Sequence, residues 1–119
     1  MNLVIIGRFP ADTEARIRAF FPPVWRVVFA GPDLAGPGLR DAEALIPEHL
    51  PINAALLDRA PKMRMIQTGA GYDNVDLAEC TRRGILVCSA AGVNAAAAAE
   101  HTMALILGWY KSIVYLDTF

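Results

Sequence analysis

The sequence contains little cysteine and no concentration of positive charge. Its two cysteines, Cys80 and Cys88, form no CxxC motif and have no histidine at metal-ligand spacing, which favours reduced thiols in a cytoplasmic protein. The 11 Lys and Arg residues are scattered among 12 Asp and Glu residues, for a net charge of −1. Because no basic stripe is present, we expect no nucleic-acid partner.

Long apolar runs are also missing. The first apolar run, Leu3–Ile6, is too short to be the core of a secretory signal. The longest uncharged stretch, Gly84–Ala99, is interrupted by glycine and asparagine, whereas a membrane-spanning helix needs about 20 mainly apolar residues. We therefore expect no membrane partner, and a chain of 119 residues is expected to form one domain at most.

What the sequence does contain is a series of short apolar runs that alternate with helical patterns. The runs with strand character are bounded by glycine, proline or polar residues. They are Leu3–Gly7, Trp25–Phe29, Glu43–Ile46, Met63–Thr68 and Ile85–Ser89. This alternation predicts an α/β fold in which helices cover both faces of a small, doubly wound sheet of five parallel strands.

Capping residues predict where the helices begin and end. Polar side chains that can accept a hydrogen bond from the first helical turn precede three helical patterns; they are Asp12 or Thr13, Asn53 and Asp76. Gly84 is expected directly after the end of the third helix. A fourth and much longer helical pattern runs from Ala95 towards Tyr115.

The turn TGAGYDNVD, Thr68–Asp76, is the strongest candidate for a binding site. Its two glycines resemble the start of a dinucleotide loop, but Asn74 stands at the third glycine position and the next strand ends without a carboxylate. We therefore expect no pyrophosphate here. The backbone N–H groups of Gly69–Gly71 could instead bind a carboxylate as an anion nest, or the glycines could form only a tight turn.

Two polar clusters are weaker candidates for chemistry. Asp73, Asn74 and Asp76 could form a metal or acid–base cluster, but such side chains more commonly hydrogen-bond a turn and cap the next helix. Glu100 and His101 are neighbours in a helical pattern, so their side chains point about 100° apart. We expect no metal site, and no catalytic pair, at either place.

The segment Thr68–Leu107 reads TGAGYDNVDLAECTRRGILVCSAAGVNAAAAAEHTMALIL and resembles the D-isomer-specific 2-hydroxyacid dehydrogenases, including phosphoglycerate dehydrogenase. The shared pattern is a glycine turn with Asp-Asn-x-Asp, a basic-Gly-Ile element, Gly-x-Asn, and a helix that carries Ala-Glu-His. The upstream segments DAEALI and LLDRAPKMRMI also fit. The resemblance implies a flavodoxin-like substrate-binding domain of an oxidoreductase that transfers a hydride between NAD or NADP and a 2-hydroxy or 2-oxo acid.

The resemblance also implies specific roles for a few residues. By this likeness the backbone N–H groups of Ala70 and Gly71 would hold the substrate carboxylate, which agrees with the anion nest suggested for Gly69–Gly71. Asn94 matches an asparagine that lies beside both the substrate and the nicotinamide. Ala98 matches a position that packs against the nicotinamide, and Ala70 also lies near the cofactor.

Parts of the family pattern are missing from this sequence. The resemblance makes residues 95–117 an interdomain helix that leads into a nucleotide-binding domain, but the sequence ends at Phe119. Residues 1–119 are therefore expected to be a single substrate-binding domain, with the nucleotide-binding domain absent. Because the family's catalytic Arg, Glu and His belong to that absent domain, we expect no catalytic residue here and no turnover by the chain alone.

A second hypothesis is a non-catalytic ligand-binding or interaction module of flavodoxin-like fold, derived from the same family. A phosphoacceptor domain is disfavoured, because Arg8 and Pro47 stand where it needs acidic residues. A flavin site is disfavoured as well, since RFPAD replaces the Ser/Thr-rich loop after the first strand.

Hydrophobic residues make up 55% of the sequence, although an average soluble domain reaches only about 45–50% even when glycine is included. The segment Gly108–Phe119 keeps apolar residues on a helical pattern to its last residue. Such a surface needs a covering partner, so we expect a homo-oligomer formed through the C-terminal helix, with exchange of terminal helices as one arrangement.

Overall fold

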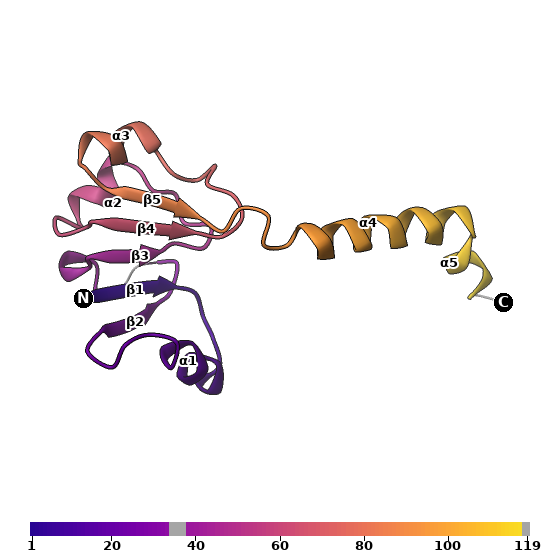
Figure 1. Ribbon diagram of the computed structural model, residues 1–119, viewed down its shortest axis with the longest axis horizontal. Helices are drawn as coiled ribbons and strands as arrows, with labels where there is room; N and C mark the ends of the chain where they lie inside the picture. Colours follow the sequence, from indigo (N-terminus) through magenta and orange to yellow (C-terminus); the bar gives the residue numbers. More distant parts are fainter. Residues whose placement is uncertain (34–37, 118–119) are drawn as a thin grey trace.

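The computed structural model describes residues 1–33 and 38–117 (Figure 1). The main body of the molecule is built around a five-stranded parallel sheet. The strands are β1 (Asn2–Ile6), β2 (Arg26–Ala30), β3 (Ala44–Ile46), β4 (Met65–Thr68) and β5 (Leu86–Ser89). Their order is β2-β1-β3-β4-β5, which is the flavodoxin-like arrangement. The predicted α/β fold with five parallel strands is therefore confirmed.

Strand β1 lies inside the sheet, between β2 and β3, and divides its side chains between two apolar clusters. Val4 and Ile6 face the larger cluster, which also contains Leu45 and Ile66 of the neighbouring strands. Residues on the opposite side of β1 face a smaller cluster that includes Val27. Alternate residues of a strand point to opposite faces, so a run of consecutive apolar residues is what a strand covered on both faces requires.

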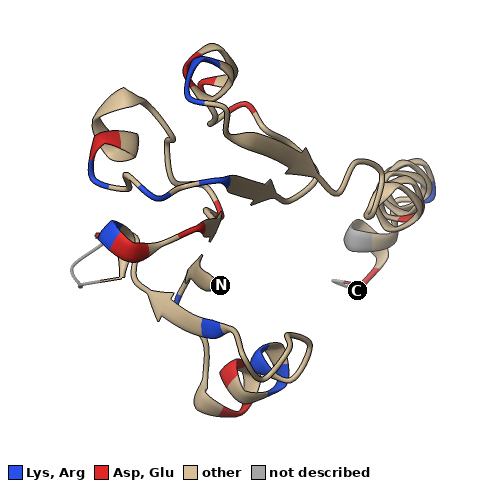
Figure 2. Ribbon diagram, turned by 60° about the vertical axis from the view of Figure 1, so that its left-hand side comes forward, with Lys and Arg blue, Asp and Glu red and all other residues tan. Residues whose placement is uncertain are grey.

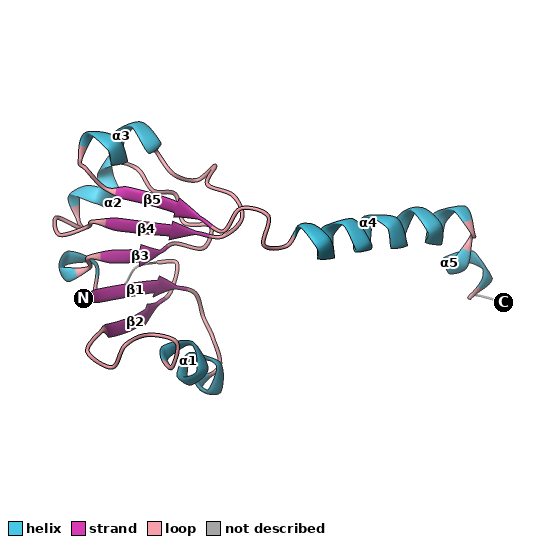
Figure 3. Cartoon of the chain, viewed as in Figure 1, coloured by secondary structure: helices cyan, strands magenta, loops and turns pink. Residues whose placement is uncertain are grey.

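Three short helices and one 3₁₀ turn cover the sheet (Figure 3). They are α1 (Ala11–Arg18), η1 (Leu39–Asp41), α2 (Ala54–Asp58) and α3 (Leu77–Arg82). Aromatic residues that follow α1 pack on the smaller cluster, whereas α2 and α3 contribute to the larger one. Charged residues of both signs lie on α1 and α3, whereas the strands are almost free of charge (Figure 2).

Two of the three predicted N-caps are confirmed. The Asn53 side chain accepts a hydrogen bond from the N–H of Leu56, and Asp76 accepts one from the N–H of Glu79. The prediction that Asp12 or Thr13 caps α1 is wrong. The helix begins at Ala11, directly after Pro10, so both polar residues lie inside its first turn.

Helix α3 ends at the predicted glycine. Gly84 has a φ of +68°. Its N–H bonds the carbonyl of Thr81 at 3.0 Å, while the N–H of Ile85 bonds the carbonyl of Cys80 at 2.9 Å. This pair of hydrogen bonds is a Schellman motif, and buried Ile85 and Cys80 supply the apolar contact that accompanies it.

The long helix α4 (Ala95–Tyr110) extends away from the sheet (Figure 1). None of its residues is buried. The radius of gyration is 18.7 Å, although a compact chain of this length has about 13–14 Å. Within the described residues, no helix combines the length and the hydropathy required to cross a membrane.

The predicted continuous helix from Ala95 towards Tyr115 is interrupted after α4. Ser112 adopts a left-handed conformation with a φ of +53°, and a separate short helix, α5 (Ile113–Leu116), follows it. The last two residues of the predicted apolar tail lie outside the described part of the chain.

Candidate functional site

A cavity of about 530 Å³ lies where β3 and β4 end, at the carboxyl edge of the sheet. Ligands of open α/β sheets bind at this edge, because the connections that leave parallel strands meet there. The glycine turn after β4 forms one wall and the loop after β3 forms the other. The lining residues are Ile46, Glu48, His49, Thr68, Gly69, Ala70, Gly71, Asp73 and Asn74.

Gly69, Ala70 and Gly71 are exposed residues, and their backbone N–H groups donate no hydrogen bond within residues 1–33 and 38–117. The turn is nevertheless anchored, since the Gly69 carbonyl accepts a 2.9 Å hydrogen bond from the N–H of Ala90. Buried Thr68 adds a second link through its hydroxyl, 3.3 Å from the carbonyl oxygen of Cys88. The turn therefore holds three unused donors at the cavity on a fixed backbone.

The glycines of this turn have a different role from the one predicted. Among the described glycines, a positive φ occurs at Gly7, Gly84 and Gly92. Gly69 and Gly71 are not among them, so the turn is not an anion nest that depends on left-handed glycine. A Cβ on Gly69 would meet no atom within 4 Å, so the position is open to solvent. Because Gly69 has no side chain, it leaves the backbone amides of the turn uncovered on its side.

The opposite wall is the loop after β3, whose polar residues were not selected from the sequence. Glu48 and His49 are exposed and line the cavity, and Glu48 has a φ of +50°. A left-handed conformation is costly for a residue other than glycine unless its surroundings hold it. Only one feature of the sequence could have indicated Glu48 and His49 as site residues, namely that they directly follow a predicted strand.

Asn74 holds this loop against the glycine turn. Its side-chain amide donates to the carbonyl of Leu50 at 2.8 Å and more weakly to that of Glu48 at 3.4 Å. Its own carbonyl accepts a 2.7 Å hydrogen bond from the N–H of Ile52. The prediction for Asn74 was a hydrogen bond within the turn, but the structure uses this residue to join two loops.

The other predicted site residues lie apart from this cavity. Asn94 occupies the N-cap position of α4 and makes no side-chain capping bond there. Ala98 lies one turn further along the helix. Both are exposed, and neither lines the cavity of the glycine turn. The structure thus brings Gly69, Ala70 and Gly71 together but leaves these two at the base of the projecting helix.

A second cavity, of about 760 Å³, lies next to the first at the ends of β1 and β3. Glu48 and His49 line both cavities, so the loop after β3 stands between them. No group of three or more His, Cys, Asp or Glu side chains in the described ranges is arranged to hold a metal ion.

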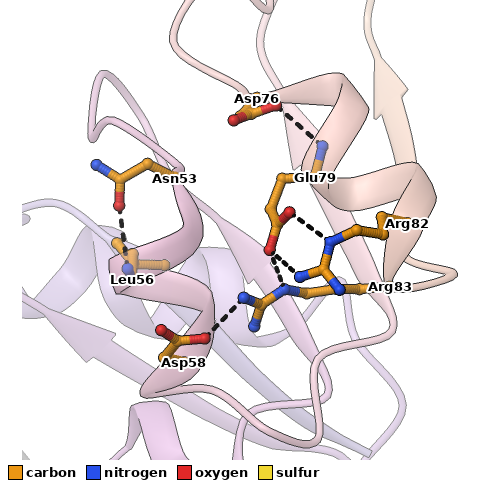
Figure 4. A network of polar contacts seen from close by, with 7 residues as sticks. All are labelled: Asn53, Leu56, Asp58, Asp76, Glu79, Arg82 and Arg83. Carbon is orange, nitrogen blue, oxygen red and sulfur yellow. Dashed lines mark hydrogen bonds and ion pairs between the residues drawn. The ribbon is translucent and has the colours of Figure 1, made fainter.

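The main charge cluster of the molecule joins α2 to α3 and does not line either cavity (Figure 4). Glu79 accepts hydrogen bonds from Arg82 and Arg83, and Arg83 also binds Asp58 at 2.7 Å. Hydrogen bonding to Arg82 first, and to Arg83 second, lowers the pKa of Glu79 to about 2. This cluster stabilises the packing of two helices.

Comparison with known proteins agrees with this fold and this turn. The family model described as "D-isomer specific 2-hydroxyacid dehydrogenase, catalytic domain" matches residues 32–114. The chain belongs to this family. Its resemblance to these dehydrogenases, first seen in the glycine turn and the Ala-Glu-His helix, is therefore confirmed.

Relatives within the 2-hydroxyacid dehydrogenase family match somewhat more than half of the chain. A glyoxylate reductase from Thermococcus litoralis is 42% identical over 69 residues, which cover 57% of this chain and 21% of that protein. A D-3-phosphoglycerate dehydrogenase from Mycobacterium leprae is 40% identical over 67 residues, which cover 56% and 13%.

Solved structures of 2-hydroxyacid dehydrogenases match nearly all of the chain. The D-lactate dehydrogenase of Aquifex aeolicus, complexed with NAD and lactic acid, aligns over 90% of this chain and 33% of its own, with a TM-score of 0.75 and 25% identity. A 2-hydroxyacid dehydrogenase from Ketogulonicigenium vulgare aligns over 98% and 37%, with a TM-score of 0.76 and 25% identity. The chain thus spans between about an eighth and three eighths of the length of these four proteins.

Proposed function

We propose that this chain is the substrate-binding domain of an NAD- or NADP-dependent D-2-hydroxyacid dehydrogenase. The observation that carries the proposal is the set of uncommitted N–H groups at Gly69–Gly71, which line a cavity at the carboxyl edge of the sheet. A carboxylate needs two or three such donors, and hydrogen bonds to a charged acceptor are stronger than neutral ones. The ligand is a small 2-hydroxy or 2-oxo acid, oriented by its carboxylate.

The residues of this chain fit one end of a nicotinamide cofactor and not its diphosphate. Asn74 replaces the third glycine of a dinucleotide loop, and β5 ends at Ser89 without a carboxylate for the ribose. Ala70 and Ala98 are small and exposed, so in our proposal they lie against the nicotinamide, with Asn94 beside the substrate. When bound, the cofactor supplies or accepts the hydride at C2 of the acid.

We further propose that the chain alone binds substrate without turning it over. In this proposal the acid–base and polarising residues belong to a nucleotide-binding domain. Residues 95–117, which contain α4 and α5, form the helical connection to that domain. The chain should not oxidise NADH in the presence of pyruvate, glyoxylate or hydroxypyruvate, followed by absorbance at 340 nm. Measurable oxidation by the purified chain would contradict this part of the proposal.

Carboxylate binding is tested directly by titrating isotope-labelled protein with pyruvate and recording amide chemical shifts. We expect saturable shifts at Gly69, Ala70 and Gly71, and no such shifts with methyl pyruvate, which lacks the carboxylate charge. Ala70→Pro removes one donor N–H and should weaken binding at least about ten-fold, the scale of one charge-assisted hydrogen bond. Equal binding of the acid and its ester would overturn the proposal without depending on any variant.

The exposed surface supports a homo-oligomer formed through α4. The accessible surface is 8416 Å², whereas a compact monomer of 12.9 kDa exposes about 6,300 Å². The excess of roughly 2,100 Å² is more than the roughly 800 Å² that each partner contributes to a standard interface.

A cytoplasmic location also belongs to the proposal, because both cysteines are free thiols.

A further inference from the structure

The larger cavity, between the ends of β1 and β3, has a wall that is mainly apolar. Its volume of about 760 Å³ lies within the range of ligand sites. Six of its lining residues are apolar: Ile6, Phe9, Pro32, Pro47, Leu50 and Pro51. Proline loses little conformational freedom on binding, so three of these residues form a wall that needs little ordering.

Phe9 is held at this cavity by its neighbours. A Cβ on Gly7 would lie 2.5 Å from the Phe9 ring, so a side chain at this position would displace the ring from where it lies. Gly7 also has a φ of +151°, which side-chain-bearing residues rarely adopt. The edge of the ring packs against Phe29 with 5.8 Å between the centroids. The aromatic wall is therefore a fixed feature of the fold.

The charges at this cavity balance. Arg8 and Glu48 both line it and carry opposite charges. A phosphate group carries nearly two negative charges and requires several cationic or N–H donors around it. One arginine and one histidine, with a carboxylate in the same lining, do not provide such a site, and the remaining wall favours carbon atoms over charged oxygens.

We propose that this cavity receives the side chain of the 2-oxo or 2-hydroxy acid whose carboxylate binds at Gly69–Gly71, and that this side chain is bulky and apolar, branched or aromatic. The two cavities adjoin at Glu48 and His49, and in this proposal one ligand extends past that loop from one cavity into the other. The inference rests on the proposed function. It adds that glyoxylate, which has no side chain, and phosphorylated acids are poorer ligands than acids such as 4-methyl-2-oxopentanoate or phenylpyruvate.

Amide-shift titrations of the 119-residue chain with four acids test this inference. The acids are glyoxylate, 3-phosphohydroxypyruvate, 4-methyl-2-oxopentanoate and phenylpyruvate. All are expected to shift Gly69–Gly71, but only 4-methyl-2-oxopentanoate and phenylpyruvate should also shift Gly7, Phe9 and Leu50. Each methylene moved from water to an apolar site strengthens binding about four-fold. Allowing for incomplete burial, both acids should bind at least about ten-fold more tightly than glyoxylate, and more tightly than 3-phosphohydroxypyruvate.

The possible outcomes separate the two proposals. If all four acids bind equally, with shifts confined to Gly69–Gly71, the side-chain inference is wrong and the proposed function stands. Tighter binding of the phosphorylated acid would have the same consequence. If no acid binds at all, both are wrong.

Variants add a second test of the apolar wall. Phe9→Ala and Leu50→Ala should each reduce the preference for phenylpyruvate over glyoxylate several-fold. Two variants are used because Phe9 also packs on Phe29, and loss of that contact could unfold the chain. Phe20→Ala is the matched control, since the Phe20 side chain is 86% exposed and lines neither cavity. An unchanged preference in a folded Leu50→Ala protein would overturn the inference.

Discussion

The side-chain amide of Asn74 donates a 2.8 Å hydrogen bond to the carbonyl oxygen of Leu50, 24 residues earlier in the chain. This contact connects the glycine turn after β4 to the loop after β3, which are the two walls of the candidate carboxylate site. Asn74 therefore holds the two walls of this cavity together.

Replacement of Asn74 by Ala should therefore lower the free energy of unfolding by about 1 kcal/mol, the usual worth of one neutral hydrogen bond, and speed amide exchange in residues 48–52. Urea unfolding and hydrogen exchange measure the two effects. Asn94→Ala is the matched control, because Asn94 makes no side-chain capping bond and its loss should cost much less. Equal effects of the two substitutions would contradict the role assigned to the Asn74 side chain in holding the loop after β3.

The Glu79 carboxylate predicts a specific dependence of stability on pH. Its pKa lies near 2 in the folded chain, against an ordinary value of 4.5, because two arginines bind the ionised form. Its contribution is thus fully present above about pH 4.5 and is lost as the pH falls towards 2. Glu79→Gln should be less stable than the parent at pH 7, and the gap should close at low pH and shrink in high salt.

Urea unfolding at pH 7, 4 and 2.5 measures this difference. Glu100→Gln on α4 serves as the control, since Glu100 takes part in no ion pair within the described residues. A gap between parent and Glu79→Gln that persisted unchanged to pH 2.5 would disprove the assigned linkage.

Two glycine substitutions should have opposite effects. Gly84→Ala places a side chain where φ is +68° and should destabilise the chain by about 1 kcal/mol, although a Cβ there meets no atom within 4 Å. Gly108→Ala lies inside α4 in equally open space and should raise helicity by a similar free energy. Urea unfolding and far-ultraviolet circular dichroism measure these effects, and a shared sign would contradict the backbone argument.

The two thiols should differ in reactivity. Cys80 is 1% exposed, and its pKa is raised, first by burial and then by the nearby Asp76 and Glu79 carboxylates. Cys88 is exposed on β5. One equivalent of a thiol reagent should react quickly at pH 8 and the second only on unfolding; Cys88→Ser should abolish the fast phase. Fast labelling of that variant would show that Cys80 is accessible.

The association proposed for α4 should depend on its exposed apolar residues. Trp109 is 89% exposed, so Trp109→Glu is expected to convert an oligomer into a monomer in multi-angle light scattering. Phe20→Glu, at an equally exposed aromatic residue after α1, should leave the mass unchanged. A monomeric parent chain at high concentration would eliminate the proposal.

The sequence was sufficient for features whose partners are close along the chain. Asn53 and Asp76 cap helices through a backbone N–H three residues away, and Gly84 ends α3 through its own conformation. The alternation of strand and helix patterns also predicted the five parallel strands, whereas their flavodoxin-like order was expected only from the family resemblance. The rules behind the caps and the alternation are local, and the structure agrees with them.

Features that depend on distant segments could not be predicted. The role of Asn74 requires the loop after β3 to lie beside it, which only the strand order provides. Glu48 adopts its left-handed conformation in that same loop, with no glycine to indicate it. The interruption at Ser112 has no proline or glycine signal either, so the helix pattern continued through it. The sequence did indicate that the glycine turn lies at the carboxyl edge of the sheet, because its position after a strand is a local property.

The projection of α4 has a consequence for how the chain responds to heat. The sheet layer has its own apolar interior, whereas α4 shares almost none of it and rests on its backbone hydrogen bonds and helix propensity. The two parts therefore have no reason to melt as a unit, and the free chain should lose its long helix at a lower temperature than its strands. A molecule that binds both parts at once should merge the two melting transitions into one, which a thermal unfolding experiment would detect.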